Sequence, residues 1–376
     1  MKGTWERLPP MDGQLMGPHL IQGLQPLAVA KFLVGLCSES IPPPSPPSPN
    51  KTQYVRLISI ANSNYAEKAR WALELCQADE ASPYYYAEDI HPPAFHCFFS
   101  LAETQNEQSR TPIVVFHRAT DKASSQATQP PVLDSDAIVR TFCPHLYPPA
   151  VAEAISVLEQ DLGHRLGATI RSLYFCGAFH RNDTLYYPGI VRLCTAHVTP
   201  IERLLFANML DKGVDRGIID CLQLTREANE EAEKVLKQTF AELSEHVIQH
   251  KLLDQPDSYW MDSPTQRYGF TAADLCIATY VASFCGDVPA LDGVASNNVR
   301  DADLPEELRQ LRTEMRATPV AAFARRIYEQ HRPVGPDNRV VIRKMRKAKN
   351  PFYNWKVAAI SVGITAAGIA LWRKRR

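Results

Sequence analysis

The sequence of 376 residues lacks several features that would place it in a well-marked class. Its nine cysteines form no C-x-x-C pair and have no metal-ligand spacing, which argues against a disulfide framework or a zinc site and for a reducing compartment. A secretory signal is not recognisable, because Glu6 and Asp12 lie where a basic and then an apolar region would stand. The Arg-rich, acid-poor composition of a transit peptide is missing as well.

The sequence also has no net charge, since 41 Lys and Arg balance 41 Asp and Glu. The balance conceals a separation: residues 339–376 hold 11 basic and no acidic residues, which leaves 30 basic against 41 acidic, or about −11, for the rest. We expect the acidic body not to bind nucleic acid, whereas the basic tail suits a membrane surface.

The remaining composition is that of a globular protein, with 45% apolar and 22% charged residues. Its length suggests two domains plus additional segments. Six prolines between residues 41 and 50 predict an extended spacer, because proline fits neither a helix interior nor a central strand. Residues 1–50 are therefore predicted to be a disordered, Pro-rich extension.

Apolar periodicity predicts an α+β fold after this spacer. The order is strand, helix, strand, hairpin and closing helix, which is thioredoxin-like, and the pattern after Pro148 is helical throughout. The segment DIHPPAFH breaks the regularity in between. The predicted strands are 54–60, 84–86, 113–116 and 131–133, and the predicted helices are 66–77 and 136–141.

Three separated parts of the chain resemble the glutathione transferase superfamily, in the correct order. They are NSNYAEKARWALEL at 62–75, TPIVVF with LDSDAIVRTF at 111–142, and FTAADLCIATYVA at 270–282. The resemblance implies a thioredoxin-like glutathione-binding domain at 51–145 and an all-helical domain at 146–332 that offers an apolar pocket to an electrophile. Glutathione would be the co-substrate, and a homodimer is one option.

A transferase must stabilise the glutathione thiolate, because a thiol with a pKa of about 8.5 is mostly protonated near pH 7. Ser63 falls on the family's serine position, at the end of the first strand, and is the candidate catalytic residue. Asn64 with Glu67 fits a capping box, so we expect Asn64 to cap the helix and to leave Ser63 freer for a ligand. Other candidates for the thiol contact are Ser59, Asn62 and Tyr65.

The other glutathione contacts follow from the resemblance alone. Pro112 matches a cis-proline that exposes the backbone of Thr111 to the cysteinyl part of glutathione. Ser135 matches the residue that holds the γ-glutamyl carboxylate, and Asp134 replaces the family's longer Glu or Gln. The loop 117–129 is longer than a hairpin needs, and the proline that often follows the active residue is missing, so the site departs from the family pattern.

Other chemistry-bearing residues are expected to be structural. Thr271 and Asp274 form a helix-capping signature. The cysteines at 76, 176 and 276 lie in apolar helical patterns and should be inert, whereas Cys97, in a Pro- and His-containing loop, is a candidate for exposure. The two histidines of that loop, His91 and His96, lack metal-ligand spacing, so no metal is expected.

The C-terminal tail predicts a membrane anchor. A basic linker at 333–354 precedes a transmembrane helix at 355–372, in which 357–372 contains 16 uncharged residues, about 24 Å of helix. A span so close to the end must insert after synthesis, so the body is expected in the cytosol. Its shortness and flanking basic residues resemble anchors of the mitochondrial outer membrane, the favoured location, more than those of the endoplasmic reticulum, whereas peroxisomal and plastid envelope anchors use similar signals.

Two functions from different classes remain open at this point. The first is a membrane-tethered glutathione transferase that conjugates or reduces small-molecule electrophiles. The second is a non-catalytic module, similar to the metaxins and the ganglioside-induced differentiation-associated proteins of the mitochondrial surface. Ser63, Pro112 and Ser135 favour the enzyme, whereas Asp134, the long hairpin loop and the anchor favour the module.

Overall fold

The structure is a computed structural model. It describes residues 45–93, 95–104, 111–118, 129–180, 225–291, 301–336 and 339–343, together with scattered residues between 192 and 207. The predicted transmembrane helix and most of the predicted N-terminal extension lie outside the described residues. Within them, no helix combines the length and the apolar character needed to cross a membrane.

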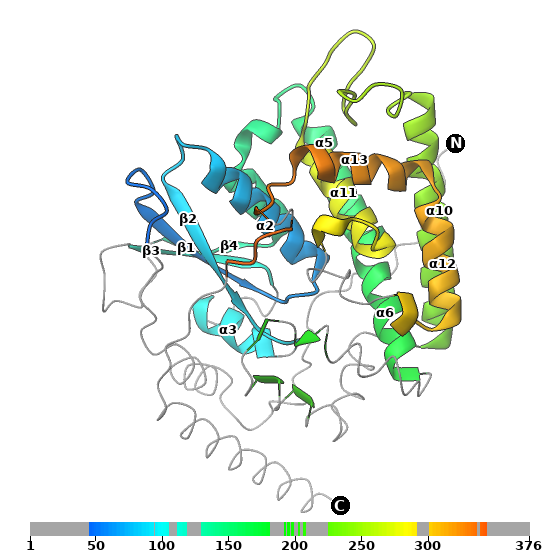
Figure 1. The fold of residues 1–376 in the computed structure, drawn as a ribbon, viewed down its shortest axis with the longest axis horizontal. Helices are drawn as coiled ribbons and strands as arrows, with labels where there is room; N and C mark the ends of the chain where they lie inside the picture. Colours follow the sequence, from blue (N-terminus) through cyan, green and yellow to red (C-terminus); the bar gives the residue numbers. More distant parts are fainter. Residues whose placement is uncertain are drawn as a thin grey trace, which may run out of the picture.

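Four strands form a mixed sheet in the order β2-β1-β3-β4 (Figure 1). β1 (Gln53–Ser59) pairs in parallel with β2 (Tyr84–Ile90) and antiparallel with β3 (Ile113–Arg118), which pairs antiparallel with β4 (Val132–Leu133). A parallel pair needs a crossover, and α2 (Asn64–Ala78) supplies it. This arrangement fits the predicted thioredoxin-like domain.

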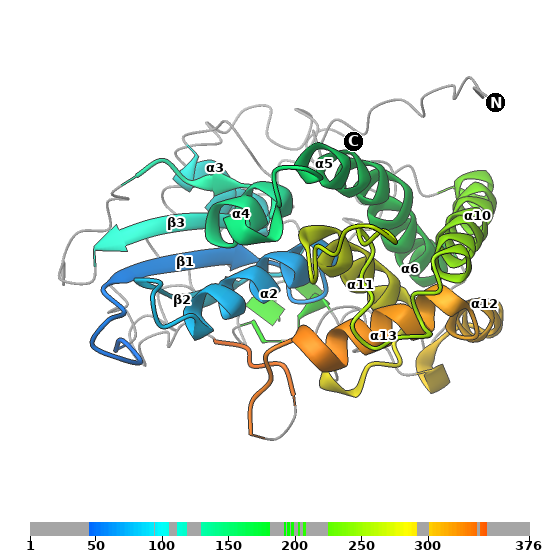
Figure 2. The ribbon, with the colours of Figure 1, turned by 90° about the horizontal axis from the view of Figure 1, so that it is seen from above.

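The central strand β1 is buried on both sides from Tyr54 onward, and helices cover both faces of the sheet. Val55 and Leu57 lie in the main core beneath α2 and α4 (Ser135–Phe142). Figure 2 shows α2 and α4 side by side over this face. Ile58 points the opposite way because side chains alternate along a strand.

The opposite face is covered by α3 (Phe95–Glu103), a helix that the sequence pattern did not predict. Phe99 of α3 packs with Ile58 of β1 and with Val115 of β3 in a separate apolar cluster. The prolines at 92 and 93 were interpreted as a break in regular structure. They instead precede the first turn, where proline is tolerated because no intrahelical partner is needed for its missing N–H.

The second half of the described chain is helical, as predicted, apart from an isolated β-bridge between Ser263 and Gln266. The π-helical turn η2 (Gly163–Gly167) joins the first two helices. The helices are α5 (Ala152–Leu162), α6 (Ala168–His180), α10 (Arg226–Gln249), α11 (Ala272–Cys285), α12 (Glu306–Arg316) and α13 (Pro319–His331), with short 3₁₀ turns η1 (Pro144–Leu146), η4 (Pro289–Leu291) and η6 (Asp301–Asp303).

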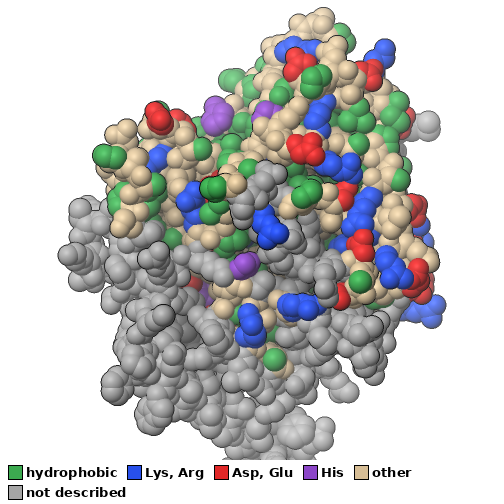
Figure 3. Space-filling view, viewed as in Figure 1, with side chains coloured by type: hydrophobic (Ala, Val, Ile, Leu, Met, Phe, Trp, Pro, Cys, Tyr) green, Lys and Arg blue, Asp and Glu red, His purple; other side chains and the backbone are tan. Residues whose placement is uncertain are grey.

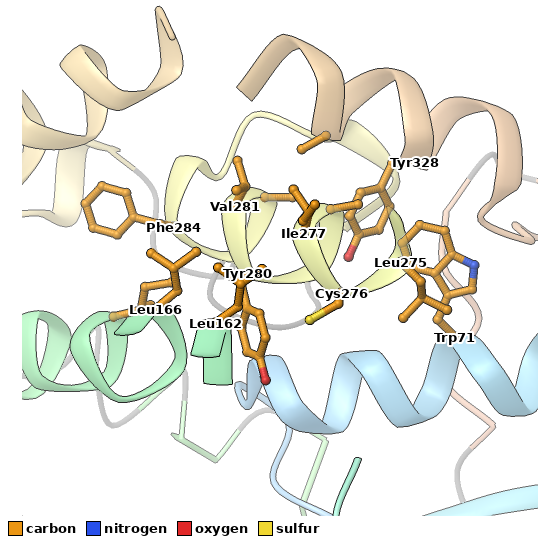
Figure 4. Close-up of a cluster of buried hydrophobic side chains, with 14 of the residues drawn as sticks. Trp71, Leu162, Leu166, Leu275, Cys276, Ile277, Tyr280, Val281, Phe284 and Tyr328 are labelled. Atoms are coloured by element: carbon orange, nitrogen blue, oxygen red, sulfur yellow. The ribbon is translucent and has the colours of Figure 1, made fainter. Parts of the chain in front are cut away.

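Helix α11 is the centre of this helical part, and every one of its residues is buried. Figure 4 shows Cys276 and Tyr280 pointing from α11 toward α2, while Ile277 and Val281 point away from it. The predicted capping role of Thr271 and Asp274 is confirmed. The Asp274 carboxylate accepts hydrogen bonds from the backbone N and the Oγ1 of Thr271, at 2.9 and 2.7 Å, and from the backbone N of Trp260 at 2.7 Å.

The chain after α13 returns to the thioredoxin-like part. The Trp71 indole of α2 donates to the His331 carbonyl at 3.1 Å, and the Arg343 carbonyl accepts from the backbone N of Glu88 in β2 at 2.7 Å. Val340 is buried in the main core. Part of the predicted juxtamembrane linker thus lies along the free edge of β2, and pairing at such an edge protects it from other chains.

Lysine, arginine and acidic side chains are interspersed over the helical part of the surface in Figure 3. No single sign of charge dominates this face. The surface there is that of an ordinary solvated helical layer.

Candidate functional site

The three predicted site segments meet at one edge of the sheet. Ile58 of β1 pairs with Ile113 of β3, which pairs with Leu133 of β4. The chain leaves β1 just after this row, enters β3 just before it and leaves β4 just after it. Because neighbouring strands lie about 4.8 Å apart, Ser63, Thr111–Pro112 and Asp134–Ser135 are brought to the same edge from separate parts of the sequence.

Two helices begin at this edge and lie side by side. Ser63 precedes the first residue of α2, and Asp134 precedes the first residue of α4. The N-terminus of a helix carries a partial positive charge and unpaired N–H groups. The edge is therefore suited to an anion or a dianion.

Ser63 is the N-cap of α2, which corrects the prediction that Asn64 would have this role. The Ser63 Oγ accepts a hydrogen bond from the backbone N of Ala66 at 3.2 Å, whereas the Asn64 Oδ1 accepts from the backbone N of Tyr65. Glu67 cannot complete a capping box because Arg70 and Arg332 hold its carboxylate. A serine hydroxyl that accepts one bond still has its own proton to donate, so capping does not remove Ser63 from ligand chemistry.

The other three candidates for the thiol contact are engaged elsewhere. The Ser59 Oγ is buried and donates to Glu88 at 2.6 Å. The Tyr65 hydroxyl donates to the Gly163 carbonyl at 2.8 Å, and its ring packs edge-on against Tyr280. The Asn62 side-chain N lies 3.9 Å from the Cys194 sulfur, and its Oδ1 is buried with no hydrogen-bond partner among the described residues. Among the four, Ser63 has the hydroxyl at the positive end of α2.

The peptide bond between Thr111 and Pro112 is cis, as predicted. Pro112 is buried and Thr111 is partly exposed. The pair stands directly before β3, between the ends of β1 and β4. Its position is the one that the resemblance implies, although no ligand contact follows from the bond itself.

Asp134 has the backbone conformation φ 63°, ψ 163°. A positive φ is unfavourable for a residue with a side chain, and such residues are concentrated at functional sites. Asp134 is the N-cap of α4, since its Oδ1 accepts from the backbone N of Ala137 at 2.9 Å. Burial raises the pKa of Asp134, while Lys68 and the N–H groups of α4 act to lower it.

Ser135 is buried and is the first residue of α4. Its Oγ donates to Asp136 Oδ1 at 3.3 Å. The N-cap of α4 is Asp134 and not Ser135. The Ser135 hydroxyl and the first turn of α4 remain close to the Thr111–Pro112 segment, as the strand register requires.

A buried lysine behind this edge was missed in the sequence. The Lys68 Nζ of α2 lies 2.5 Å from Asp136 Oδ1 of α4 and 2.7 Å from Glu159 Oε1 of α5, and the Lys68 side chain is fully buried. Charges at 67, 68 and 70 resemble a solvated helix face. No local pattern distinguishes them from a solvated face, because the partners that allow their burial come from distant parts of the chain.

Helix α2 has a second set of buried charges on its β2 side. Arg70 donates to both oxygens of Glu88, at 2.5 and 2.8 Å, and to Glu67 at 2.5 Å. Arg332 donates to Glu67 at 2.9 Å, and Arg343 reaches Glu74. Buried charges require partners, and these partners come from β2 and from the chain after α13. These ion pairs hold α2, the helix that begins directly after Ser63, in place.

His91 lies at the same edge, on the β2 side, because its backbone N donates to the Ser59 carbonyl. Its Nδ1 is 2.6 Å from Glu202 and its Nε2 is 3.2 Å from Asp89. Burial acts to lower the pKa of His91, but the two carboxylates outweigh it and the pKa is raised. His91 thereby links Glu202 to Asp89 of β2. Among the described residues, no group of three His, Cys, Asp or Glu side chains is arranged to hold a metal.

The cysteines of the described chain are buried. This agrees with the prediction for Cys76, Cys176 and Cys276, and burial raises the pKa of the Cys276 thiol to about 12. It corrects the expectation for Cys97, which is covered in α3 and lies 3.4 Å from His96 Nε2. Burial lowers the pKa of His96 to about 3, so this histidine is neutral at physiological pH.

No protein-family model matches the chain, and no curated protein matches it. Among solved structures it is similar to Ure2p in complex with glutathione, with 13% identity and a TM-score of 0.35 over 74% of this chain and 96% of that one. It is similar to a Tau class glutathione S-transferase from mango, Mangifera indica, with 12% identity and a TM-score of 0.32 over 72% and 91%. It is also similar to a glutathione S-transferase of Ceriporiopsis subvermispora in complex with glutathione, with 12% identity and a TM-score of 0.39 over 75% and 99%. The assignment of the fold rests on the strand order and helix placement described above.

Proposed function

We propose that the protein binds glutathione at the edge of the sheet where α2 and α4 begin, and that it activates the thiol for attack on an electrophile. Ser63 would contact the sulfur and the Thr111 backbone the cysteinyl part. Asp134 and Ser135 would hold the γ-glutamyl amine and carboxylate. The observation that carries the proposal is the convergence of these residues, from three separate segments, on one edge.

The electrostatics of the edge support an anionic ligand. Glutathione has two carboxylates and, when activated, a thiolate. The positive ends of α2 and α4 favour negative charge by about 0.3–1 kcal/mol each when exposed, and by up to about 2 kcal/mol when partly buried. The hydroxyl of Ser63 can donate to the sulfur anion while it caps α2.

The chemistry requires no group that transfers a proton. The thiol proton leaves to solvent, and the hydroxyl and the helix end stabilise the sulfur anion. The sulfur lone pair then forms a bond to an electrophilic carbon, which passes its electron pair to a leaving group or to a conjugated acceptor. The identity of the electrophile is left open by the residues at the edge.

The Ser135→Ala variant tests the location of the ligand by calorimetric titration with glutathione. Loss of a charge-assisted hydrogen bond of about 1.5–3 kcal/mol should weaken binding roughly tenfold or more. Ser283→Ala is the matched control, because the buried Ser283 hydroxyl of α11 donates to the Thr279 carbonyl within its own helix. Equal affinity in Ser135→Ala and the wild type would place the ligand elsewhere.

A second function is supported by a specific observation. Val198 packs against Ala61 and Ile90 at the ends of β1 and β2, and Cys194 lies against Asn62. These contacts, together with the pair between His91 and Glu202, bring the helical part onto the turn that leads to Ser63. The turn before Ser63 is therefore covered, and a covered turn suits a non-catalytic binding module. Glutathione binding without any lowering of the thiol pKa would favour this alternative.

We further propose that the protein is tail-anchored through residues 355–372, with the body in the cytosol and the mitochondrial outer membrane as the favoured location. The support is the sequence alone: an uncharged run at 357–372 flanked by basic residues. Carbonate extraction of the full chain and of a chain cut after Asn350 is the test. A truncated chain that stays membrane-integral would contradict the assignment.

A further inference from the structure

Lys68 connects three helices behind the proposed glutathione site. It lies on the second turn of α2, its side chain is fully buried, and its ammonium group contacts carboxylates of α4 and α5. The thioredoxin-like part supplies Asp136 and the helical part supplies Glu159. The lysine therefore stands where the two parts of the molecule meet, one helical turn from the residues that begin α2.

The carboxylate of Asp136 continues this chain of contacts to the proposed site. It accepts the hydrogen bond of the Ser135 hydroxyl, and it belongs to the first turn of α4. Asp134 precedes it by two residues and caps the same helix. Two carboxylates thus lie at a helix start that is expected to receive the carboxylate of a ligand.

Glu159 has its own partners on the far side of Lys68. It accepts from the Tyr147 hydroxyl at 3.0 and 3.1 Å, and Arg140 lies 3.7 Å away with its guanidinium over the Tyr147 ring. Glu159 can keep a compensating cation nearby if Lys68 is lost. Asp136 has no other cation among the ion pairs of the described residues.

We propose that Lys68 is a positioning residue for glutathione: it neutralises Asp136, so that the Ser135 hydroxyl can turn its proton from Asp136 to the γ-glutamyl carboxylate at the first turn of α4. The inference rests on the proposed function. Lys68 makes no contact with the ligand in this account and acts through Asp136. The tyrosine and cysteine side chains that α11 directs toward α2 leave little water to screen the charge (Figure 4).

The groups that face Lys68 decide its charge. Burial acts to lower the pKa of Lys68, whereas Cys276, Glu159, Asp136 and Tyr280 act to raise it, and the pKa lies well above its ordinary value. Burial raises the pKa of Tyr280 well above its ordinary value and that of Cys276 to about 12, so both are neutral near pH 7. The lysine is therefore cationic across the range in which binding is measured.

The test measures the affinity of the full-length chain for S-hexylglutathione between pH 5.5 and pH 7.5. The blocked sulfur of this probe has no proton to titrate. Lys68→Met should weaken binding at least about tenfold at pH 7.5, because the uncompensated Asp136 carboxylate lies within about 6 Å of a carboxylate that is hydrogen-bonded to the Ser135 Oγ, and the two charges repel at an effective dielectric constant of about 20.

Two further variants separate the charge from the fold. Lys68→Met with Asp136→Asn should recover affinity to within about threefold of the wild type, since the charge that Lys68 neutralises is gone. Lys51→Met is the matched control: Lys51 is also buried but donates to carbonyls at the other end of α2. Its affinity should equal that of the wild type.

Each outcome has a defined meaning. If the wild type does not bind the probe, the proposed function and this inference both fail. If the wild type binds but Lys68→Met has the same affinity, only the role of Lys68 is overturned. Should Lys68→Met fail to fold by circular dichroism, Asp136→Asn alone decides, because the proposal expects equal or tighter binding and a threefold or larger loss would refute it.

Discussion

Ser63 has two roles in this account, and substitutions can separate them. Its Oγ caps α2 by accepting from the backbone N of Ala66 at 3.2 Å, and its proton is expected to go to the glutathione sulfur. Ser63→Ala removes both. The lost cap should lower the free energy of unfolding by about 1 kcal/mol. The lost hydrogen bond to the thiolate, about 1.5–3 kcal/mol, should raise the pKa of bound glutathione by about one to two units.

Two conservative replacements provide the controls. Ser63→Thr keeps both the cap and the hydroxyl proton, so unfolding and thiol pKa should stay close to the wild type. Ser63→Asp also caps a helix but presents only acceptors, so it should keep the stability and lose the activated thiol. Urea unfolding gives the first quantity, and ultraviolet titration of the bound thiolate gives the second. Coincident thiolate titrations for wild type and Ser63→Ala, with glutathione bound in both, would reduce Ser63 to a cap.

Three further predictions concern the rest of the chain. Burial raises the pKa of Asp274 to about 6, above the unfolded value of about 3.9, so protonation of this carboxyl group stabilises the folded state. In urea unfolding, the free energy of unfolding of the wild type, relative to that of Asp274→Asn, should rise by about 1.3 kcal/mol from pH 7 to pH 5. A difference that does not depend on pH would refute this. Arg343→Ala should cost about 1–2 kcal/mol in thermal unfolding because it leaves the buried Glu74 with fewer donors, whereas Arg226→Ala, in an exposed pair, should cost less than about 0.5 kcal/mol. Ile364→Arg should release much of the protein from membranes on carbonate extraction, since one arginine at the centre of a span opposes insertion by about 2.5–3.5 kcal/mol.

Much of the fold was predictable because its signals are local. The apolar runs of β1 and β3 are strong strand patterns, and Thr271 with Asp274 is a helix start that needs no tertiary information. The cis bond before Pro112 was predicted from the resemblance, since neighbouring residues alone give no such signal. The placement of the site segments at one edge then follows from strand order.

The parts that could not be predicted depend on contacts between distant residues. Asn64 with Glu67 satisfies the capping-box pattern, but Arg332, far along the chain, holds Glu67 and prevents it. Lys68 reads as a surface residue until Glu159 is brought to it by the helical part. Helix α3 was not predicted because the prolines at 92 and 93 resemble a break in regular structure. They precede the first turn of the helix, where their missing N–H groups need no intrahelical partner.

The most direct test of the central claim is a crystal structure of the protein with glutathione. The account predicts the sulfur within hydrogen-bond distance of the Ser63 Oγ, and the γ-glutamyl carboxylate at the first turn of α4 beside Ser135. Glutathione bound away from the edge formed by the ends of β1, β3 and β4 would contradict the account, as would an edge that stays empty at saturating glutathione.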